Sequence, residues 1–383
     1  MKKVFFAAFF VLVFFAACNN NNKDDVYGGF EDTDEEPSEK VDEDRPAAER
    51  PDDAPRPGGV VGNESERSDG SSVSKDDDSE IPDDDDSEIS DEENVDNNEI
   101  YALEPDVGKC TSGIPSDSEK LKVLNRLNYL RSIHKLKTVK YNDAYDEMTG
   151  ECALVIAANK KLDHEPDSSW KCYSNVAYDG CYSSNISLAM TTNYDTCQID
   201  SATIIDGFMT EENEVPPTTL GHRRWFIDPW LNTIAFGRAD YSDGAGHFIL
   251  GSAVRVINRD NPSDQQNISD SDIKFVAYPF ESYPAELYND NVMMSFTVIS
   301  DKNSKINNGA NINFASATIA IIDPNNKTMK VKNIEYDTEM YGVPNNLRWY
   351  AEGIKPNVKY NVTVSNVMVN NNPEFYQYWF ELK

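Results

Sequence analysis

Residues 221–229 read GHRRWFIDP and residues 232–237 read NTIAFG, and the fold assignment rests on these two neighbouring runs. The second run lies inside a segment, residues 230–238, that predicts a β-strand. A second strand is predicted at residues 248–258, after the turn-forming sequence DGAG at residues 243–246. The quoted runs therefore lie at the start of a pair of predicted strands.

Three helices are predicted on the N-terminal side of these strands, at residues 116–134, 143–162 and 202–209. The first begins with SDSE, which forms a capping box, and a Cys- and Ser-rich stretch between the second and third is predicted to be irregular. His134 falls at the C-terminal end of the first helix, where the helix dipole favours a partly cationic ring. Together these elements predict an α/β/α domain over about residues 108–260.

The two quoted runs resemble the signature of bacterial CAP domains. That superfamily contains the cysteine-rich secretory proteins, antigen 5 and the plant pathogenesis-related class-one proteins. Three further elements follow the order of the family: RSIHKL at residues 131–136, His164 after the second helix, and Asn185-Ile186, which resembles the tail of a Gly-Glu-Asn-Ile box. The resemblance implies an α/β/α sandwich with a cleft that holds two histidines and two acids.

Carried over residue by residue, the resemblance places His164 and His222 at the two histidine positions and Glu211 at one acid position. The other acid should precede Asn185, but Ser184 stands there. One of the four cleft groups is therefore missing, and the expected binding cleft consists of these five residues.

Three interpretations of the cleft stay open. Two neutral imidazoles and a carboxylate could hold zinc or another divalent metal, with His164, His222 and Glu211 as ligands and an open position for water. That water could make the protein a metal-assisted hydrolase of peptide or envelope material, but the carboxylate that would take its proton is replaced by Ser184. Alternatively, the histidines bond to Glu211 and water and hold the fold. The chain has no Gly-x-Ser-x-Gly motif to support a serine nucleophile.

About residues 270–383 predict a separate all-β domain with its own core, with alternating segments at residues 292–299, 317–322 and 360–367. IKPNVKYNVTV at residues 354–364 resembles the tyrosine-corner stretch of fibronectin type III domains and implies an immunoglobulin-like β-sandwich. Trp349 and Tyr350 could lie in its core or form an exposed pair for stacking carbohydrate; the core is favoured.

Residues 1–18 predict a lipoprotein signal peptide. Two lysines precede the apolar run at residues 4–15, which as a helix of about 18 Å is too short to span a bilayer of about 30 Å. The run ends in Ala16-Ala17-Cys18, which resembles a lipobox and implies a diacylglycerol on Cys18 that anchors the chain to the membrane. The alternative is an ordinary signal peptide in which Cys18 is incidental.

Residues 19–107 predict a disordered acidic linker. Between Lys23 and Ile100 there are 31 acidic and 7 basic residues, so this stretch carries −24 of the formal net charge of −32 on the 383-residue chain. Such a segment buries too little apolar surface to fold. The charge also argues against a nucleic-acid partner, because few bases are present to neutralise phosphates.

Five cysteines remain after Cys18: Cys110, Cys152, Cys172, Cys181 and Cys197. Two disulfides and one free thiol are expected, and five choices of the free thiol with three pairings of the rest give 15 arrangements. Cys172 and Cys181 could close a short loop. Disulfides fit an oxidising compartment outside the cytoplasm.

The sequence therefore predicts an α+β chain with a CAP domain and a β-sandwich, carried by an acidic linker. The expected location is the cell envelope, at the outer membrane or cell surface. The expected function is a non-catalytic module that binds lipid, glycan or protein; the alternative is the metal-assisted hydrolase.

Overall fold

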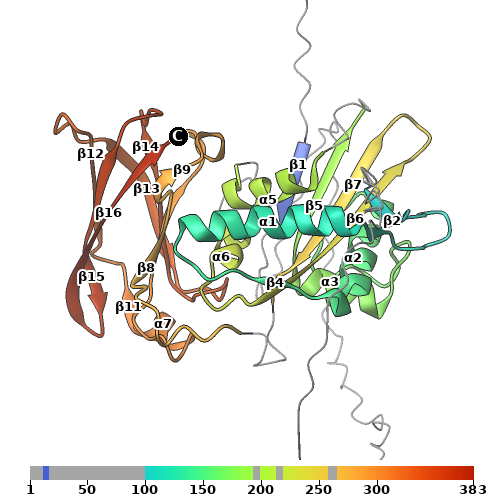
Figure 1. Ribbon diagram of the computed structural model, residues 1–383, viewed down its shortest axis with the longest axis horizontal. Helices are drawn as coiled ribbons and strands as arrows, with labels where there is room; N and C mark the ends of the chain where they lie inside the picture. The colour runs from blue at the N-terminus through green and yellow to red at the C-terminus, as the bar shows by residue number, and fades with distance from the viewer. Residues whose placement is uncertain (1–11, 17–99, 193–198, 213–218, 258–264) are drawn as a thin grey trace, which may run out of the picture. The chain divides into compact units, whose positions relative to one another are not determined.

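The computed structural model describes residues 12–16, 100–192, 199–212, 219–257 and 265–383 (Figure 1). All of these residues belong to one compact unit of the chain. Cys18 and most of the predicted linker lie outside the described residues. Among the residues that are described, no helix is long and apolar enough to cross a membrane.

The part of the chain before residue 258 mixes helices and strands. Its helices are α1 (Asp117–Ile133), α2 (Asp146–Asn159), α3 (Asn175–Tyr182), α5 (Ser201–Thr210) and α6 (Gly221–Phe226), with a 3₁₀ turn at Asp143–Tyr145. Its strands are β1 (Leu12–Ala16), β2 (Tyr101–Leu103), β3 (Ile114–Pro115), β4 (Lys140–Tyr141), β5 (Ser184–Thr191), β6 (Thr233–Ser242) and β7 (Phe248–Arg255).

The predicted helices and strands of this part are confirmed to within a few residues by α1, α2, α5, β6 and β7. α1 begins where the capping box predicts, because the Ser116 hydroxyl accepts a hydrogen bond from the Glu119 N–H at 3.4 Å. The prediction of an irregular stretch before α5 is wrong, since this stretch contains α3 and β5.

Five of the strands form one sheet in the order β1-β5-β7-β6-β4, antiparallel except for the β4–β6 pair, and β2 pairs separately with β3. Helices cover both faces (Figure 1). On one face Leu127 of α1 belongs to the same buried cluster as Phe236 of β6, and on the other Val155 of α2 belongs with Ile186 of β5. The predicted α/β/α sandwich is confirmed.

Gly237, the last residue of the NTIAFG run, allows α2 to approach the sheet closely. A Cβ atom at this position would collide with the backbone carbonyl of Thr149 in α2. A main-chain atom cannot move aside as the end of a side chain can, so the helix–sheet distance requires glycine here.

The part after residue 264 consists mainly of strands. Its elements are β8 (Phe275–Tyr278), β9 (Glu281–Tyr283), a 3₁₀ turn (Ala285–Leu287), β10 (Met294–Val298), α7 (Asn307–Ala310), β11 (Ile312–Asn313), β12 (Thr318–Ile322), β13 (Lys330–Asp337), β14 (Asn346–Glu352), β15 (Tyr360–Val369) and β16 (Asn372–Leu382). They form two sheets, β13-β14-β10-β8 and β11-β15-β16-β9, with β12 also paired to β15.

Aromatic side chains pack between these two sheets. The ring of Phe296 on β10 lies 5.3 Å from that of Tyr376 and 6.2 Å from that of Tyr378 on β16, measured between centroids. Trp349 has no exposed surface, which confirms its prediction as a core residue, while Tyr350 is half-buried. The Tyr360 hydroxyl accepts a hydrogen bond from the Lys355 N–H at 3.0 Å, the contact expected of a tyrosine corner. The immunoglobulin-like assignment itself stays a prediction.

The two parts do not have separate cores, contrary to the sequence prediction. A single cluster of buried residues contains Leu127 of α1 and Phe236 of β6 together with Trp349 and Val362 of the β-sandwich. Both parts also belong to the same compact unit. The boundary predicted between residues 260 and 270 therefore separates two architectures but not two hydrophobic cores.

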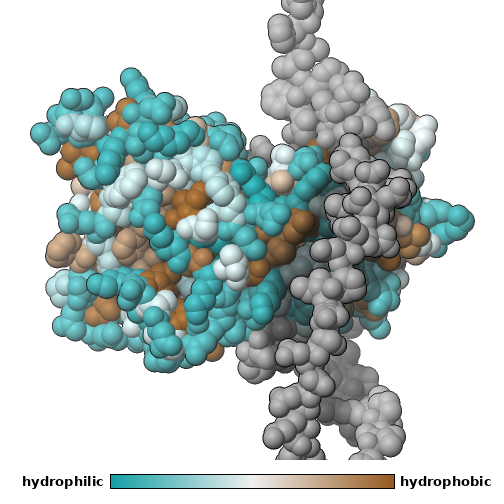
Figure 2. Space-filling view, in the orientation of Figure 1, coloured by the Kyte–Doolittle hydropathy of each residue, from teal (hydrophilic) through white to brown (hydrophobic). Residues whose placement is uncertain are grey.

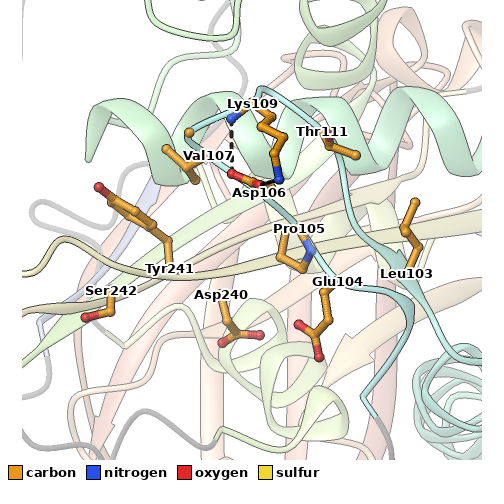
Figure 3. A pocket seen from close by; sticks show the side chains of 11 residues that line it. Leu103, Glu104, Pro105, Asp106, Val107, Lys109, Thr111, Asp240, Tyr241 and Ser242 are labelled. Carbon is orange, nitrogen blue, oxygen red and sulfur yellow. Dashed lines mark hydrogen bonds and ion pairs between the residues drawn. The ribbon is translucent and has the colours of Figure 1, made fainter.

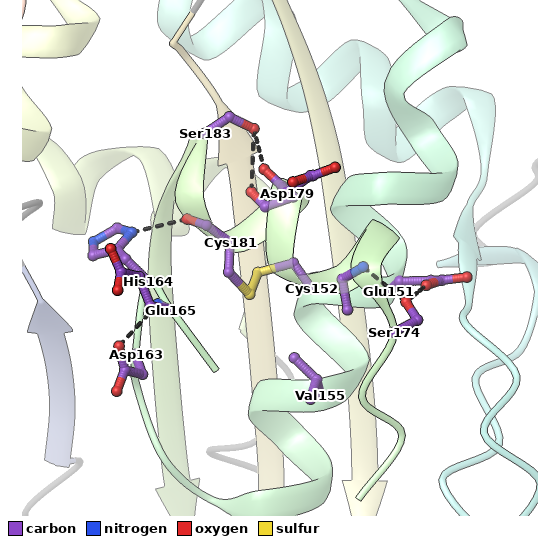
Figure 4. Close-up of a disulfide and its surroundings, with 12 residues drawn as sticks. Glu151, Cys152, Val155, Asp163, His164, Glu165, Ser174, Asp179, Cys181 and Ser183 are labelled. Carbon is purple, nitrogen blue, oxygen red and sulfur yellow. Dashed lines mark hydrogen bonds between the residues drawn. A yellow bond between two sulfur atoms is a disulfide. The ribbon is translucent and has the colours of Figure 1, made fainter. Parts of the chain in front are cut away.

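Two disulfides are present among the described residues, Cys110–Cys172 and Cys152–Cys181, the second of which joins α2 to α3 (Figure 4). The expectation of two disulfides is confirmed, but the suggested Cys172–Cys181 loop is wrong. Cys197 lies outside the described residues.

Two findings concern the N-terminal segments. The backbone of Leu12–Ala16, inside the predicted signal peptide, pairs antiparallel with β5 as an edge strand. Tyr101, inside the predicted linker, is buried and its hydroxyl donates to Asp240. The predicted linker therefore extends too far, and the folded part begins before residue 107.

Candidate functional site

The signature residues lie where α5 ends and α6 begins. Glu211 follows the last turn of α5 in the left-handed conformation, with φ of 49°, and its N–H donates to the Gly207 carbonyl at 3.0 Å. Its carboxylate accepts a hydrogen bond from the backbone N–H of Arg223 at 2.5 Å. Glu211 therefore connects the end of α5 to the first turn of α6.

His222 lies in α6 and is only 1% exposed. Its ring packs against Phe208 of α5, with 4.9 Å between the ring centroids. Its backbone carbonyl accepts a hydrogen bond from the Asn185 side-chain amide of β5 at 3.0 Å. The structure thus brings Asn185, Glu211 and His222 to one place, where α5, α6 and the start of β5 meet.

His164 is held by a different contact. It follows α2, is half-buried, and its Nδ1 donates to the Cys181 carbonyl at 2.8 Å (Figure 4). Cys181 is near the end of α3, three residues before Ser184, which is fully buried at the start of β5. The observed role of His164 is to hold the end of α3 beside the strand that carries Ser184 and Asn185.

The described residues, which include His164, Glu211 and His222, contain no group of three or more His, Cys, Asp or Glu side chains that could hold a metal ion. His164, Glu211 and His222 do not form such a group in this structure. The zinc set stays a prediction from the resemblance.

The two arginines of the GHRRWFIDP run have contacts that the sequence analysis missed. The Arg223 guanidinium donates to the Met209 carbonyl at 2.6 Å, to the Thr210 carbonyl at 2.8 Å and to the Met293 carbonyl at 2.7 Å. It also lies over the Tyr278 ring, 3.7 Å from the centroid. The only sequence signal was a pair of charges within a segment rich in aromatic residues.

Arg224 also connects α6 to the β-sandwich. Its guanidinium donates to the Asp337 carboxylate at 2.8 Å and to the Glu339 carbonyl at 2.6 Å, beside the Tyr341 ring. Burial lowers the pKa of Arg224. Both arginines of the signature thus bind the β-sandwich. Residues of the β-sandwich therefore take part in positioning α6.

His134 is buried between α1 and the β-sandwich, next to the rings of Tyr278, Phe280 and Tyr283. Burial lowers its pKa to about 3, and the nearby charges of Arg223 and Arg131 act in the same direction. The expectation of a partly cationic ring is therefore wrong, because the lost hydration outweighs the favourable helix dipole.

A cavity of about 500 Å³ lies elsewhere and contains none of the predicted site residues (Figure 3). It is lined by residues 103–109, Thr111 and residues 240–242. Two of its three carboxylates have partners within the chain: Asp106 pairs with Lys109, and Asp240 pairs with Arg238. These ion pairs explain Asp106 and Asp240 as structural residues, with no ligand required.

Residues 124–251 match the family model described as CAP, the cysteine-rich secretory protein family. This region is a CAP domain, and the match covers the signature site as well as α5, α6 and most of the sheet. No curated protein matches the chain. The CAP domain and the two disulfides indicate an extracellular location.

Proposed function

We propose that the protein is a binding module of the cell envelope, held at the outer membrane or cell surface by lipid on Cys18, which binds lipid, glycan or protein through its CAP domain. The extracellular location and the role as an interaction module are supported by the CAP match and the disulfides. The lipid anchor is supported by the sequence before Cys18 alone.

The observation that favours binding over catalysis is that the signature side chains are buried and that those of Glu211 and Asn185 bond to main-chain atoms. Glu211 binds the Arg223 N–H, Asn185 binds the His222 carbonyl, and Glu211 and His222 are each 1% exposed. A general base or nucleophile must reach a substrate atom directly or through one water. These groups instead support main chain around the site.

The test compares ligand binding with turnover in one preparation. The full chain, purified from its own envelope without denaturant, is examined by native mass spectrometry for a bound small molecule or glycan. The Asn185→Leu variant, which removes the bond to the His222 carbonyl, should lose that added mass while keeping its fold in thermal unfolding. Asn372→Leu, an exposed position on the β-sandwich, is the control.

The hydrolase alternative is tested with the same samples. Each is incubated with a fluorogenic peptide mixture and with purified envelope fragments, with and without zinc. Zinc-dependent cleavage by the wild type that is lost in His222→Ala would sink the binding proposal and establish an enzyme.

A further inference from the structure

The side chains of β16 alternate between two faces of its sheet. One set enters the core of the β-sandwich: Tyr376, Tyr378 and Phe380. Because side chains alternate along a strand, the other set lies on the opposite face: Phe375, Gln377 and Trp379. We call these three residues, together with Asn361 and Thr363 on β15, the β16 outer face.

Two aromatic rings mark this face. Phe375 is 65% exposed, the second most exposed of the large apolar side chains described, and Trp379 is half-buried. They are four residues apart on one strand, which separates their Cα atoms by about 13 Å. The Lys359 ammonium lies over one face of the Trp379 ring, 4.0 Å from its centroid, so this ring has a defined orientation and only its other face is left for stacking.

The side chains between and beside the rings are uncharged and polar. Asn361 lies opposite Trp379 in the β15–β16 register, and Thr363 lies opposite Gln377. Amides and hydroxyls both donate and accept hydrogen bonds, as sugar hydroxyls do. The faces of pyranose rings present C–H groups that pack on aromatic rings. Two aromatic residues about 13 Å apart, with amides and hydroxyls between and beside them, therefore match separate sugars of one chain.

We infer that the β16 outer face binds a neutral polysaccharide chain, with Phe375 and Trp379 stacking on separate sugars and Gln377, Asn361 and Lys359 bonding to hydroxyls. This site is independent of the proposed function of the CAP cleft, with which it shares no residue.

Other occupants fit the face less well. Two aromatic side chains offer at most about 300–500 Å², whereas a stable protein interface buries about 800 Å² on each partner. A nucleic acid or an anionic membrane would be repelled by residues 101–383, which contain 36 acidic and 26 basic residues, a net charge of 26 − 36 = −10. On the face of the molecule drawn in Figure 2, hydrophobic side chains form small separate patches within hydrophilic surroundings.

The experiment is affinity electrophoresis of the full chain in native gels containing hydroxyethyl cellulose, a β-1,4-glucan, or dextran, an α-1,6-glucan, with polysaccharide-free gels as reference. At least one polysaccharide should retard the wild type. Phe375→Ala and Trp379→Ala should each weaken binding at least fivefold, and Trp379→Phe should retain most of it because a ring remains. Tyr336→Ala, which removes a 49% exposed ring from β13, is the matched control and should bind as the wild type does.

Two further measurements make the result decisive. Because neither ring belongs to the core, both alanine variants should unfold within about 2 °C of the wild type. His222→Ala should bind polysaccharide normally, which separates this site from the cleft. No retardation by either polysaccharide, or equal retardation of the Phe375→Ala/Trp379→Ala double variant, would overturn the inference. So would a dimer, seen by light scattering, that the double variant abolishes.

Discussion

The guanidinium group of Arg223 donates to the backbone carbonyl of Met293 at 2.7 Å, which ties helix α6 to the chain just before β10. The same group binds the carbonyls of Met209 and Thr210, the two residues that precede Glu211. One side chain therefore holds both the turn that carries Glu211 and the β-sandwich.

Arg223→Lys should lower the free energy of unfolding by about 3 kcal/mol. A lysine ammonium lacks the planar fork that reaches three separate carbonyls, so buried oxygens would lose their donors. Urea unfolding followed by tryptophan fluorescence measures the change. Lys330→Met, at a 69% exposed side chain, is the control and should change stability by less than about 0.5 kcal/mol. A loss no greater in Arg223→Lys than in the control would contradict this role.

Acid should destabilise the fold through His134, whose pKa burial lowers to about 3. In the unfolded chain this ring takes up a proton as the pH falls through its ordinary pKa of about 6.5. Above about pH 6.5 the ring is neutral in both states, so the full free energy of unfolding is retained. Between about 6.5 and 3 the unfolded state binds a proton that the folded state does not, so stability falls by at most about 1.4 kcal/mol per pH unit.

The measurement is the free energy of unfolding at about pH 7.5 and about pH 5. The charged groups near His134 are Arg131 and Arg223, which repel a proton, and its ring neighbours Tyr278 and Tyr283 stay neutral because burial raises their pKa values. His134→Phe should lose less stability over this interval than the wild type. Tyr336→Phe, at a 49% exposed ring, should keep the wild-type slope; equal slopes in all three proteins would rule out the effect.

Gly237→Ala should destabilise the protein by about 2 kcal/mol, because the added methyl group collides with the Thr149 carbonyl and must push α2 from the sheet. Gly108→Ala is the control, since its nearest neighbour is the mobile end of the Asp106 side chain. Thermal unfolding of the two variants gives the comparison. Equal melting temperatures would show that the helix yields without cost.

The anchor is tested by growing cells with a clickable fatty-acid analogue. The wild type should carry the label and fractionate with membranes, whereas Cys18→Ala should carry no label and appear in the medium. Cys197→Ala is the control for nonspecific acylation of a second cysteine. A Cys18→Ala protein that stays labelled would exclude a lipid on Cys18.

The sequence predicted the elements whose signals are local. Ser116 caps α1 as the capping box indicates, and β6 and β7 follow the predicted strands. β5 was not predicted, because its polar residues form bonds to distant parts of the chain: Asn185 to the His222 carbonyl, and Ser187 to Ser252. Such residues look like a loop until their partners are known.

The candidate site shows the same limit. The positions of Glu211 and His222 followed from the family resemblance, but the contacts of Arg223 and Arg224 did not. Several of their acceptors are backbone carbonyls, which leave no mark in the sequence, and those in the β-sandwich lie 70 or more residues away. The shared core was missed for a related reason, since hydrophobic periodicity identifies a buried face but not what covers it.

The buried cluster that the two parts share has a consequence for how this gene can be rearranged. A CAP segment cut from the chain after Ile257 would leave Leu127 and Phe236 without part of the cluster that buries them and would remove the Met293 acceptor of Arg223. It could not be moved between genes as a free-standing cassette, because the product would expose apolar surface to chaperones and proteases. Insertions and recombination points should therefore be selected against between the two halves.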